Sequence, residues 1–369
     1  MSPEGGAALN VHYGDVLIKY GEVLDVSSAS LPHIPNADIV SKFKGSALED
    51  GDVIIADTAE DETVGKCAEV PNLQGKTAIS GLHTIPCRPT KRFATGYLGY
   101  YMNSSAYHDQ LLPLMQGIKV TSISKSALQD TVLSWPESIE EQAQIGRYFM
   151  NLDHLITLHQ RKYDKLLSIK KSMLEKMFPR DGSKFPEIRF SGYTDPWEQR
   201  KLASIAEEIT RNDPASDAPI MMITANNGFI DQSERYAFNN AGESLKKYIL
   251  LNKGELAYNH GASKIRPYGS CFALTTAENA RIPFVYHCFS VGENDPEFVS
   301  MELNGSRVEN QLRKIVSSGA RMDGLLNISY EEYSAVELML PSVQEQKRLS
   351  DYFRQLDHLI TLHQREYAA

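Results

Sequence analysis

The decapeptide "LDHLITLHQR" occurs at Leu152–Arg161 and again, unchanged, at Leu356–Arg365, 204 positions later. When the match is extended in both directions, it runs from Ser138 to Tyr163 and from Ser342 to Tyr367, and 16 of these 26 positions are identical. Such self-similarity at a fixed offset is the signature of an internal repeat. We therefore interpret the chain as one unit of about 200 residues written twice.

Weaker similarities continue upstream at nearly the same offset. The tripeptide "GKC" at Gly65–Cys67 matches "GSC" at Gly269–Cys271, and His83 matches His287. Each repeat thus consists of a variable segment followed by a conserved one.

The conserved segment has the spacing of a heptad helix, alternately four and three residues. The predicted helix-pairing residues are Ile145, Phe149, Leu152, Ile156, His159 and Tyr163 in the first copy, and Leu349, Phe353, Leu356, Ile360, His363 and Tyr367 in the second. In the first copy the pattern continues through Leu166, Lys170, Met173 and Met177.

The ends of the first helix are marked by local signals. Ser138 with Glu141 three residues later predicts a capping box, and "FPRDG" at Phe178–Gly182 ends the helix. A helix from Ser138 to Phe178 is about 60 Å long, and it must bury its apolar stripe against a partner. We expect the second copy to be that partner, in antiparallel packing with the identical decapeptides in contact; the alternative is a helix in the core of one domain. His159 and His363 are expected to pack or hydrogen-bond across this seam rather than to bind a metal.

The variable segments have the composition of mixed α and β domains. Short apolar runs bounded by turn residues predict strands, among them 51–57, 77–85, 254–260 and 282–291. The predicted fold class is α+β, with two such domains separated by two long antiparallel helices that form a coiled coil. The predicted boundaries are 1–136 for the first domain, 137–180 for the central helix, 181–341 for the second domain and 342–369 for the distal helix.

Composition restricts the class of protein. No stretch approaches 18 uncharged apolar residues and the N-terminal sequence lacks signal-peptide features, so we expect a cytoplasmic protein. The four cysteines form no CxxC pair and are expected to be buried, reduced thiols. No cofactor, metal or nucleophile motif is found, so a catalytic function is not indicated. The net charge of −9 argues mildly against a simple polyanion binder.

Any nucleic-acid contact must therefore come from local clusters of basic and polar residues. In the second half, "HGASKIRPYGS" follows a predicted strand and offers side chains that can reach phosphates and base edges. The matching loop of the first half, "DTAEDETVGK", is acidic, so there Glu60 or Asp61 can only accept hydrogen bonds. The predicted contact residues are Lys19, Arg88, Lys91, Arg92 and Lys119 in the first half, and His260, Ser263, Lys264, Arg266, Tyr268 and Arg321 in the second. For each single cation, the simpler interpretation is a solvated surface charge.

The chain resembles the specificity subunits of type I restriction-modification systems. The resemblance covers nearly the whole sequence and rests on the duplicated "EEQ…YF..LD.LI.LHQR.Y" segments, on "KFPEIRFSGYTDPWEQRKL" (Lys184–Leu202), "VHYGDVLIKYG" (Val11–Gly21) and "SGLHTI..RP" (Ser80–Pro89), and on the "QG.K…IS…L" loop (Gln116–Leu128). It implies two target recognition domains, each of which reads half of a bipartite site in double-stranded DNA. It also implies that the chain is not an enzyme: two modification (methyltransferase) subunits dock on the helices, and ATP-dependent restriction subunits cleave.

The sequence departs from this family pattern at both ends. The first half has no counterpart to "FSGYTDPWEQRKLASIAEEI" (Phe190–Ile209), and the second helix has no counterpart to Asp164–Phe178. We therefore expect an N-terminally incomplete first domain, a C-terminally truncated second helix, and a chain that is poorly soluble or self-associated without partners. Two other functions remain open: an enzyme with an unrecognised site, and a coiled-coil scaffold that binds proteins without reading DNA, which the acidic charge slightly favours.

Overall fold

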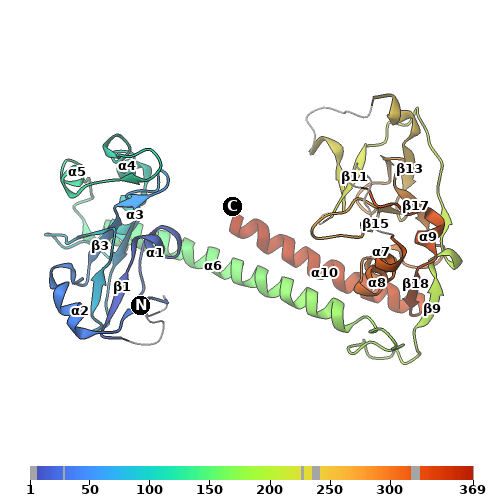
Figure 1. The fold of residues 1–369 in the computed structure, drawn as a ribbon, viewed down its shortest axis with the longest axis horizontal. Helices are drawn as coiled ribbons and strands as arrows, with labels where there is room; N and C mark the ends of the chain where they lie inside the picture. Colours follow the sequence, from blue (N-terminus) through green and yellow to red (C-terminus); the bar gives the residue numbers. More distant parts are fainter. Residues whose placement is uncertain (1–5, 28–29, 226–227, 235–241, 317–324, 369) are drawn as a thin grey trace. The chain divides into compact units, whose positions relative to one another are not determined.

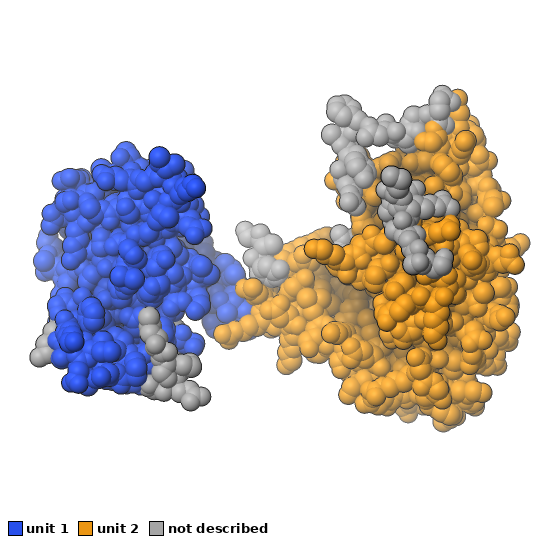
Figure 2. Space-filling model, in the orientation of Figure 1, with its two compact units in different colours: residues 1–158 blue, residues 159–369 orange. Residues whose placement is uncertain are grey.

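The chain divides into two compact units, residues 1–158 and 159–369 (Figure 2). The structure is a computed structural model that describes residues 6–27, 30–225, 228–234, 242–316 and 325–368. Helices and strands are mixed in both units, as expected for the α+β class (Figure 1). Among the described helices, none is long and apolar enough to cross a membrane.

Unit 1 is built on a three-stranded sheet of order β5-β3-β7 and a second of order β2-β1-β6. The fully buried strand β3 lies at the centre of the first sheet. The elements are β1 (Ala8–Val11), α1 (Tyr13–Ile18), β2 (His33–Ile34), α2 (Ala37–Lys42), β3 (Asp52–Ala56), β4 (Thr58–Ala59), β5 (Cys67–Val70), β6 (Ala78–Ser80), β7 (Thr84–Cys87), α3 (Tyr97–Asn103), α4 (Ser105–His108), β8 (Thr121–Ser122), α5 (Lys125–Gln129) and the start of α6 (Ile139–Lys176).

Unit 2 repeats this plan around a four-stranded sheet of order β10-β17-β14-β15. Its elements are the end of α6, β9 (Glu198–Lys201), β10 (Glu207–Glu208), β11 (Met221–Thr224), β12 (Gly228–Asp231), β13 (Ile249–Asn252), β14 (Leu256–Asn259), β15 (Ser270–Ala273), β16 (Asn279–Ile282), β17 (His287–Ser290), α7 (Pro296–Leu303), α8 (Ser306–Ile315), α9 (Tyr330–Ser334), β18 (Glu337–Leu340) and α10 (Val343–Ala368).

Two of the predicted strands do not run as single strands over their predicted residues. The run 77–85 contains β6 and the start of β7, and the run 282–291 contains the last residue of β16 and the whole of β17. In unit 1 the chain turns at His83, which has a φ of 56°, and passes from one sheet to the other: β6 pairs with β1, whereas β7 pairs with β3. The single-strand prediction was wrong because an apolar run carries no sign of such a change of sheet.

The central strands show which residues of the two units correspond. Val53 pairs with Cys87 in unit 1, and Leu256 pairs with Phe289 in unit 2. Two residues further along the central strand, Ile55 pairs with Ile85 in unit 1 and Tyr258 pairs with His287 in unit 2. His287 therefore corresponds to Ile85. The predicted match of His83 with His287 is therefore wrong by two residues.

An asparagine fastens the following helix to the sheet in both units. Asn103 accepts a hydrogen bond from the backbone N–H of Cys67 (2.9 Å) and donates to its carbonyl (2.8 Å). Asn304 makes the same two bonds, at 3.1 and 2.5 Å, with Cys271. The predicted match of "GKC" with "GSC" is thus confirmed. Of the four cysteines, all free, three are buried as predicted and Cys87 is half-buried.

The conserved "EEQ" and "QEQ" motifs fasten the start of each long helix. The Oε1 atom of Gln142 accepts from the N–H of Ala94 (3.1 Å), and its Nε2 donates to the carbonyl of Pro136 (2.7 Å). In the second copy Gln346 accepts from Asp295 N–H (2.9 Å) and donates to the carbonyl of the proline that precedes α10 (3.0 Å). Both glutamines are buried. The two helices therefore leave their domains in the same way.

The cap of α6 is only partly as predicted. The Oγ atom of Ser138 accepts from the N–H of Glu141 (3.3 Å), which makes it the expected N-terminal cap. The hydroxyl donates to the carboxylate of Glu140 (3.0 Å), and no return bond from the Glu141 carboxylate is found among the described residues.

Within unit 2, the end of α6 packs antiparallel against α10 (Figure 1). His159 Nδ1 lies 3.0 Å from His363 Nδ1, Lys170 binds Asp357 (2.5 Å), and the rings of Phe178 and Phe353 are 6.2 Å apart. Rising numbers on α6 meet falling numbers on α10, so these segments pair antiparallel as predicted. The buried seam residues of α10 are Leu349, Phe353, Leu356 and Ile360.

The first part of the α6 seam differs from the prediction. Leu152 and Ile156 are 37% and 44% exposed instead of buried. The reason is the register of the two helices. His159 contacts His363, its own counterpart in the repeat and a residue near the end of α10. Because α10 runs antiparallel to α6, it covers the residues of α6 that follow His159. Ile145 packs into the core of unit 1 and Phe149 stacks on Tyr100, while Tyr163 is half-buried. The side chain of Tyr367 lies outside the described residues.

Candidate nucleic-acid interface

Two loops meet in unit 1 at the end of the central strand. The loop 57–66 leaves β3, and its strand β4 pairs with β8 of the loop 116–123. The N–H of Ile123 donates to the carbonyl of Asp57 (2.9 Å), directly where β3 ends. The central strand therefore fixes the base of both loops.

The same two loops meet in unit 2. The N–H of Leu326 donates to the carbonyl of His260 (2.9 Å), and Gly261 forms a bridge with Leu325. His260 and Leu326 each lie 203 positions after their counterparts in unit 1, Asp57 and Ile123. We call the loops 57–66 and 116–123 of unit 1, and 260–269 and 325–328 of unit 2, the paired loops.

Most of the charged side chains on the paired loops of unit 1 are acidic. Asp61 turns back on its own loop, where Thr63 donates its N–H (2.9 Å) and its hydroxyl (2.5 Å) to the carboxylate and lowers its pKa. The neighbouring loop has the opposite character, because Lys119 is exposed at its tip beside the fully exposed Ile118. The paired loops of unit 1 therefore present one exposed cation, Lys119, next to several hydrogen-bond acceptors.

In unit 2, five of the six predicted contact residues lie on the loop 260–269, and three of these five help to build the loop itself. Arg266 donates through Nη1 to the carbonyl of Asn304 (2.8 Å), and burial lowers the pKa of its guanidinium. His260 is buried, with Nδ1 2.9 Å from the carbonyl of Leu326. Tyr268 is half-buried, and its carbonyl accepts from the hydroxyl of Tyr258 (2.7 Å).

The exposed part of this loop is its tip. Ser263 and Lys264 are exposed there beside Ile265, and the Oγ atom of Ser263 accepts from the N–H of Arg266 (3.0 Å). Lys264 is therefore more accessible to a ligand than Arg266. Arg321 lies outside the described residues.

Three predicted cations of unit 1 lie away from the paired loops. Because β7 runs antiparallel to β3, the residues after β7 lie at the opposite end of the sheet. Arg88 is held there by the buried Asp52 (2.9 Å to each carboxylate oxygen) and by Glu49 (2.7 Å). Lys91 lies over the ring of Trp135, and Arg92 is exposed.

Lys19 lies closer to the paired loops of unit 1. It follows α1 and forms an ion pair with Asp15 (2.6 Å). The carbonyl of Leu17 in the same helix accepts from Lys66, the last residue of the loop 57–66 (2.9 Å). Lys19 and Lys119 are therefore the predicted cations that remain candidates near this surface.

The sequence interpretation missed the residues that build this scaffold. The asparagine and glutamine clamps stand at equivalent places in both copies, so an alignment of the two repeats contains the signal that marks them. The isoleucines at the loop tips were missed because a single apolar residue in a loop has no periodicity. Among the described residues, no group of three or more His, Cys, Asp or Glu side chains could hold a metal ion.

No protein-family model and no curated protein matches the chain. Among solved structures, the S subunit of a type I restriction-modification system from M. genitalium is similar over the whole chain and 86% of its own length, with 12% identity and a TM-score of 0.56. The HsdS subunit from Thermoanaerobacter tengcongensis is 18% identical over 88% of this chain and 77% of its own, with a TM-score of 0.46. A third structure, from work on the assembly and conformational transition of the type I R-M system, is 16% identical over 87% and 78%, with a TM-score of 0.45. At these identities, the M. genitalium structure establishes the fold of the chain.

Proposed function

We propose that this chain is the specificity subunit of a type I restriction-modification system, in which each unit reads one half of a bipartite site in double-stranded DNA. The observation that carries the proposal is the repeated scaffold with unlike loops. The same backbone hydrogen bond joins the paired loops in both units, from Ile123 to Asp57 and from Leu326 to His260, while the side chains on the loops differ. One framework with two sets of contact residues suits two readers with different targets.

The paired loops supply the contacts in this proposal. Lys119 and Lys264, with the hydroxyl of Ser263, reach phosphates or base edges, whereas the carboxylates of the loop 57–66 accept hydrogen bonds, for example from the amino group of cytosine. Arg266 does not contact DNA in this proposal but fixes the conformation of its loop through its hydrogen bond to the carbonyl of Asn304. Lys19 adds a phosphate contact beside the loop in unit 1.

The long helices set the distance between the two readers and carry the partners. Exposed apolar residues on α6, among them Leu152, Leu155 and Ile156, offer a surface for two methyltransferase subunits. These subunits methylate, and ATP-dependent restriction subunits cleave, so the chain itself does no chemistry. Its acidic charge is compatible with DNA binding if the partners provide much of the positive surface. We place the complex in the cytoplasm.

Mapping of methylated adenines in cells that express the chain with its methyltransferase subunits tests this proposal. We expect methylation at one split sequence with a fixed spacer. The protein-binding scaffold, which the charge of −9 favours, predicts no sequence-specific methylation that depends on this chain. A matched control expresses the methyltransferase subunits alone.

A further inference from the structure

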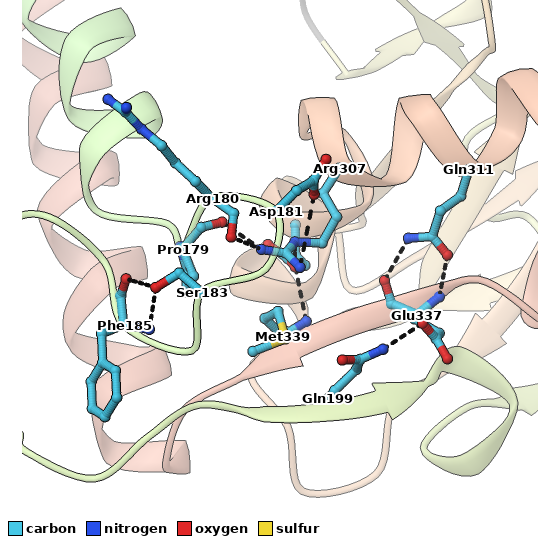
Figure 3. A network of polar contacts seen from close by, with 11 residues as sticks. Pro179, Arg180, Asp181, Ser183, Phe185, Gln199, Arg307, Gln311, Glu337 and Met339 are labelled. Carbon is cyan, nitrogen blue, oxygen red and sulfur yellow. Dashed lines mark hydrogen bonds and ion pairs between the residues drawn. The ribbon is translucent and has the colours of Figure 1, made fainter.

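Strand β18 of unit 2 is held along one edge by side chains. Gln311 donates to the carbonyl of Glu337 and accepts from its N–H, both at 2.8 Å (Figure 3). Two residues on, the N–H of Met339 donates to the carboxylate of Glu302 (2.9 Å). Because backbone groups alternate in direction along a strand, those of Leu338 and Leu340 point to the other edge.

That other edge pairs with β9. Leu338 lies opposite Arg200 and Leu340 opposite Glu198 in an antiparallel register. The four side chains of β9 itself are exposed. Trp197 before it and Leu202 after it are 1% and 0% exposed and belong to the largest buried cluster of unit 2. The segment is thus an edge strand anchored by two apolar side chains.

Unit 1 holds the corresponding segment, 131–135, by the same contacts. Gln110 accepts from the N–H of Val132 (3.0 Å) and donates to its carbonyl (3.1 Å), as Gln311 does in unit 2. Two residues on, the N–H of Ser134 donates to the hydroxyl of Tyr101 (2.9 Å). Residues 131–135 therefore lie against α3 and α4 as β18 lies against α7 and α8.

The second edge of this segment is open. Among the described residues, no strand pairs with 131–135, and no hydrogen bond reaches the backbone of Leu133 or Trp135. Val132 is 66% exposed and Leu133 is 38% exposed, whereas Leu338, the counterpart of Leu133, is fully buried. An unpaired edge with apolar side chains is a template for an added strand.

A cavity of about 330 Å³ lies beside this edge. Its lining includes Val53, Cys87, Leu98 and Leu133. Their counterparts follow from the strand registers, from Asn103 and Asn304, and from the contacts of Gln110 and Gln311. They are Leu256, Phe289, Val299 and Leu338, all members of the buried cluster that contains Trp197 and Leu202. The cavity of unit 1 therefore corresponds to the place that the two anchors fill in unit 2.

We propose that this edge and cavity form a binding site for an extended segment of a second polypeptide that carries a tryptophan followed five positions later by a leucine. The segment adds as an antiparallel strand to residues 131–135, and its two anchors enter the cavity. Strand addition takes affinity from backbone hydrogen bonds and specificity from side-chain pockets, which matches a strand whose intervening side chains are exposed. The site does not depend on DNA reading, so its test is separate from that of the proposed function.

A labelled peptide with the sequence of residues 190–206, which contains both anchors, tests the proposal by fluorescence anisotropy with the full chain. We expect saturable binding that weakens about 30-fold or more for the peptides Trp197→Ala and Leu202→Ala, because buried aromatic anchors dominate such interfaces. A control peptide in which the order of residues 198–201 is reversed should bind within about threefold, since those side chains are exposed in unit 2. Equal binding of the peptides without anchors, or no saturable binding, contradicts the proposal.

Two further measurements locate the site. In unit 2 the N–H of Leu202 donates to the carbonyl of Val336 (2.9 Å), whose counterpart in unit 1 is Thr131. A photo-crosslinking residue at the Leu202 position of the peptide should therefore label the neighbourhood of Thr131 in unit 1, and labelling of unit 2 contradicts the proposal. In the protein, Leu133→Asp should abolish binding, while Val132→Glu, which introduces the residue type of Glu337, should preserve it. If Leu133→Asp binds like the unaltered chain, the edge is not the site.

Discussion

Replacement of Gln346 by alanine should strongly destabilise unit 2. This side chain is 1% exposed and accepts from the N–H of Asp295 while it donates to the carbonyl of Pro341. The change leaves both backbone groups without a partner, at about 1–3 kcal/mol each. Asp295 also caps α7 through the N–H of Phe298 (2.9 Å), so its displacement loosens a second element. We expect a loss of about 2–6 kcal/mol in the free energy of unfolding.

Urea denaturation followed by tryptophan fluorescence measures this loss. The chain has two tryptophans, so a Trp135→Phe background makes the buried Trp197 the reporter of unit 2. Gln344→Ala, two residues away on the exposed side of the same helix, is the matched control and should change stability by no more than about 0.5 kcal/mol. If Gln346→Ala costs no more than this control, the clamp does not hold the helix to the domain.

Three further variants test the pH dependence and the loops. Burial raises the pKa of Glu302 from 4.5 to about 7. Its contribution to the free energy of unfolding is therefore fully present below pH 4.5, and on the order of 3 kcal/mol of it is lost as the pH rises to about 7. Glutamine does not titrate, so the free energy of unfolding of Glu302→Gln relative to that of the unaltered chain should be higher at pH 8 than at pH 5 in urea titrations. The same difference at both pH values would contradict this. Lys264→Ala should weaken binding of the assembled complex to all DNA sequences alike and reduce the salt slope by about one unit, without a change in melting temperature. Arg266→Ala should lower both DNA affinity and the stability of unit 2, because its guanidinium binds the carbonyl of Asn304. An unchanged melting temperature would contradict this. It would indicate instead that Arg266 contacts DNA directly, with a cost of about 1–3 kcal/mol at one base pair.

The repeat, the long helices and their antiparallel contact could be predicted from the sequence because each rests on periodicity. Ten identical residues fix the offset, and the heptad pattern fixes which face of α10 is buried. The centre of the pairing could not be predicted in this way. The same heptads fit several registers, and the contact between His159 and His363 selects one of them.

The candidate contact residues were harder to predict because the partner of a charged side chain depends on tertiary register. Arg88 binds Asp52, 36 positions earlier, and Arg266 binds the carbonyl of Asn304, 38 positions later. Nothing near either arginine in the sequence distinguishes a structural cation from a ligand-binding one. Lys264 keeps its predicted exposure because it lies at a loop tip, where tertiary contacts are few.

The central claim, two independent readers on one scaffold, is tested most directly by an exchange of one reader. Residues 186–341 are replaced by the corresponding segment of a specificity subunit with a known target, and methylated adenines are mapped in cells that also express the methyltransferase subunits. The account predicts that one half of the bipartite site changes while the other half stays the same. A change in both halves, or in neither, would contradict it.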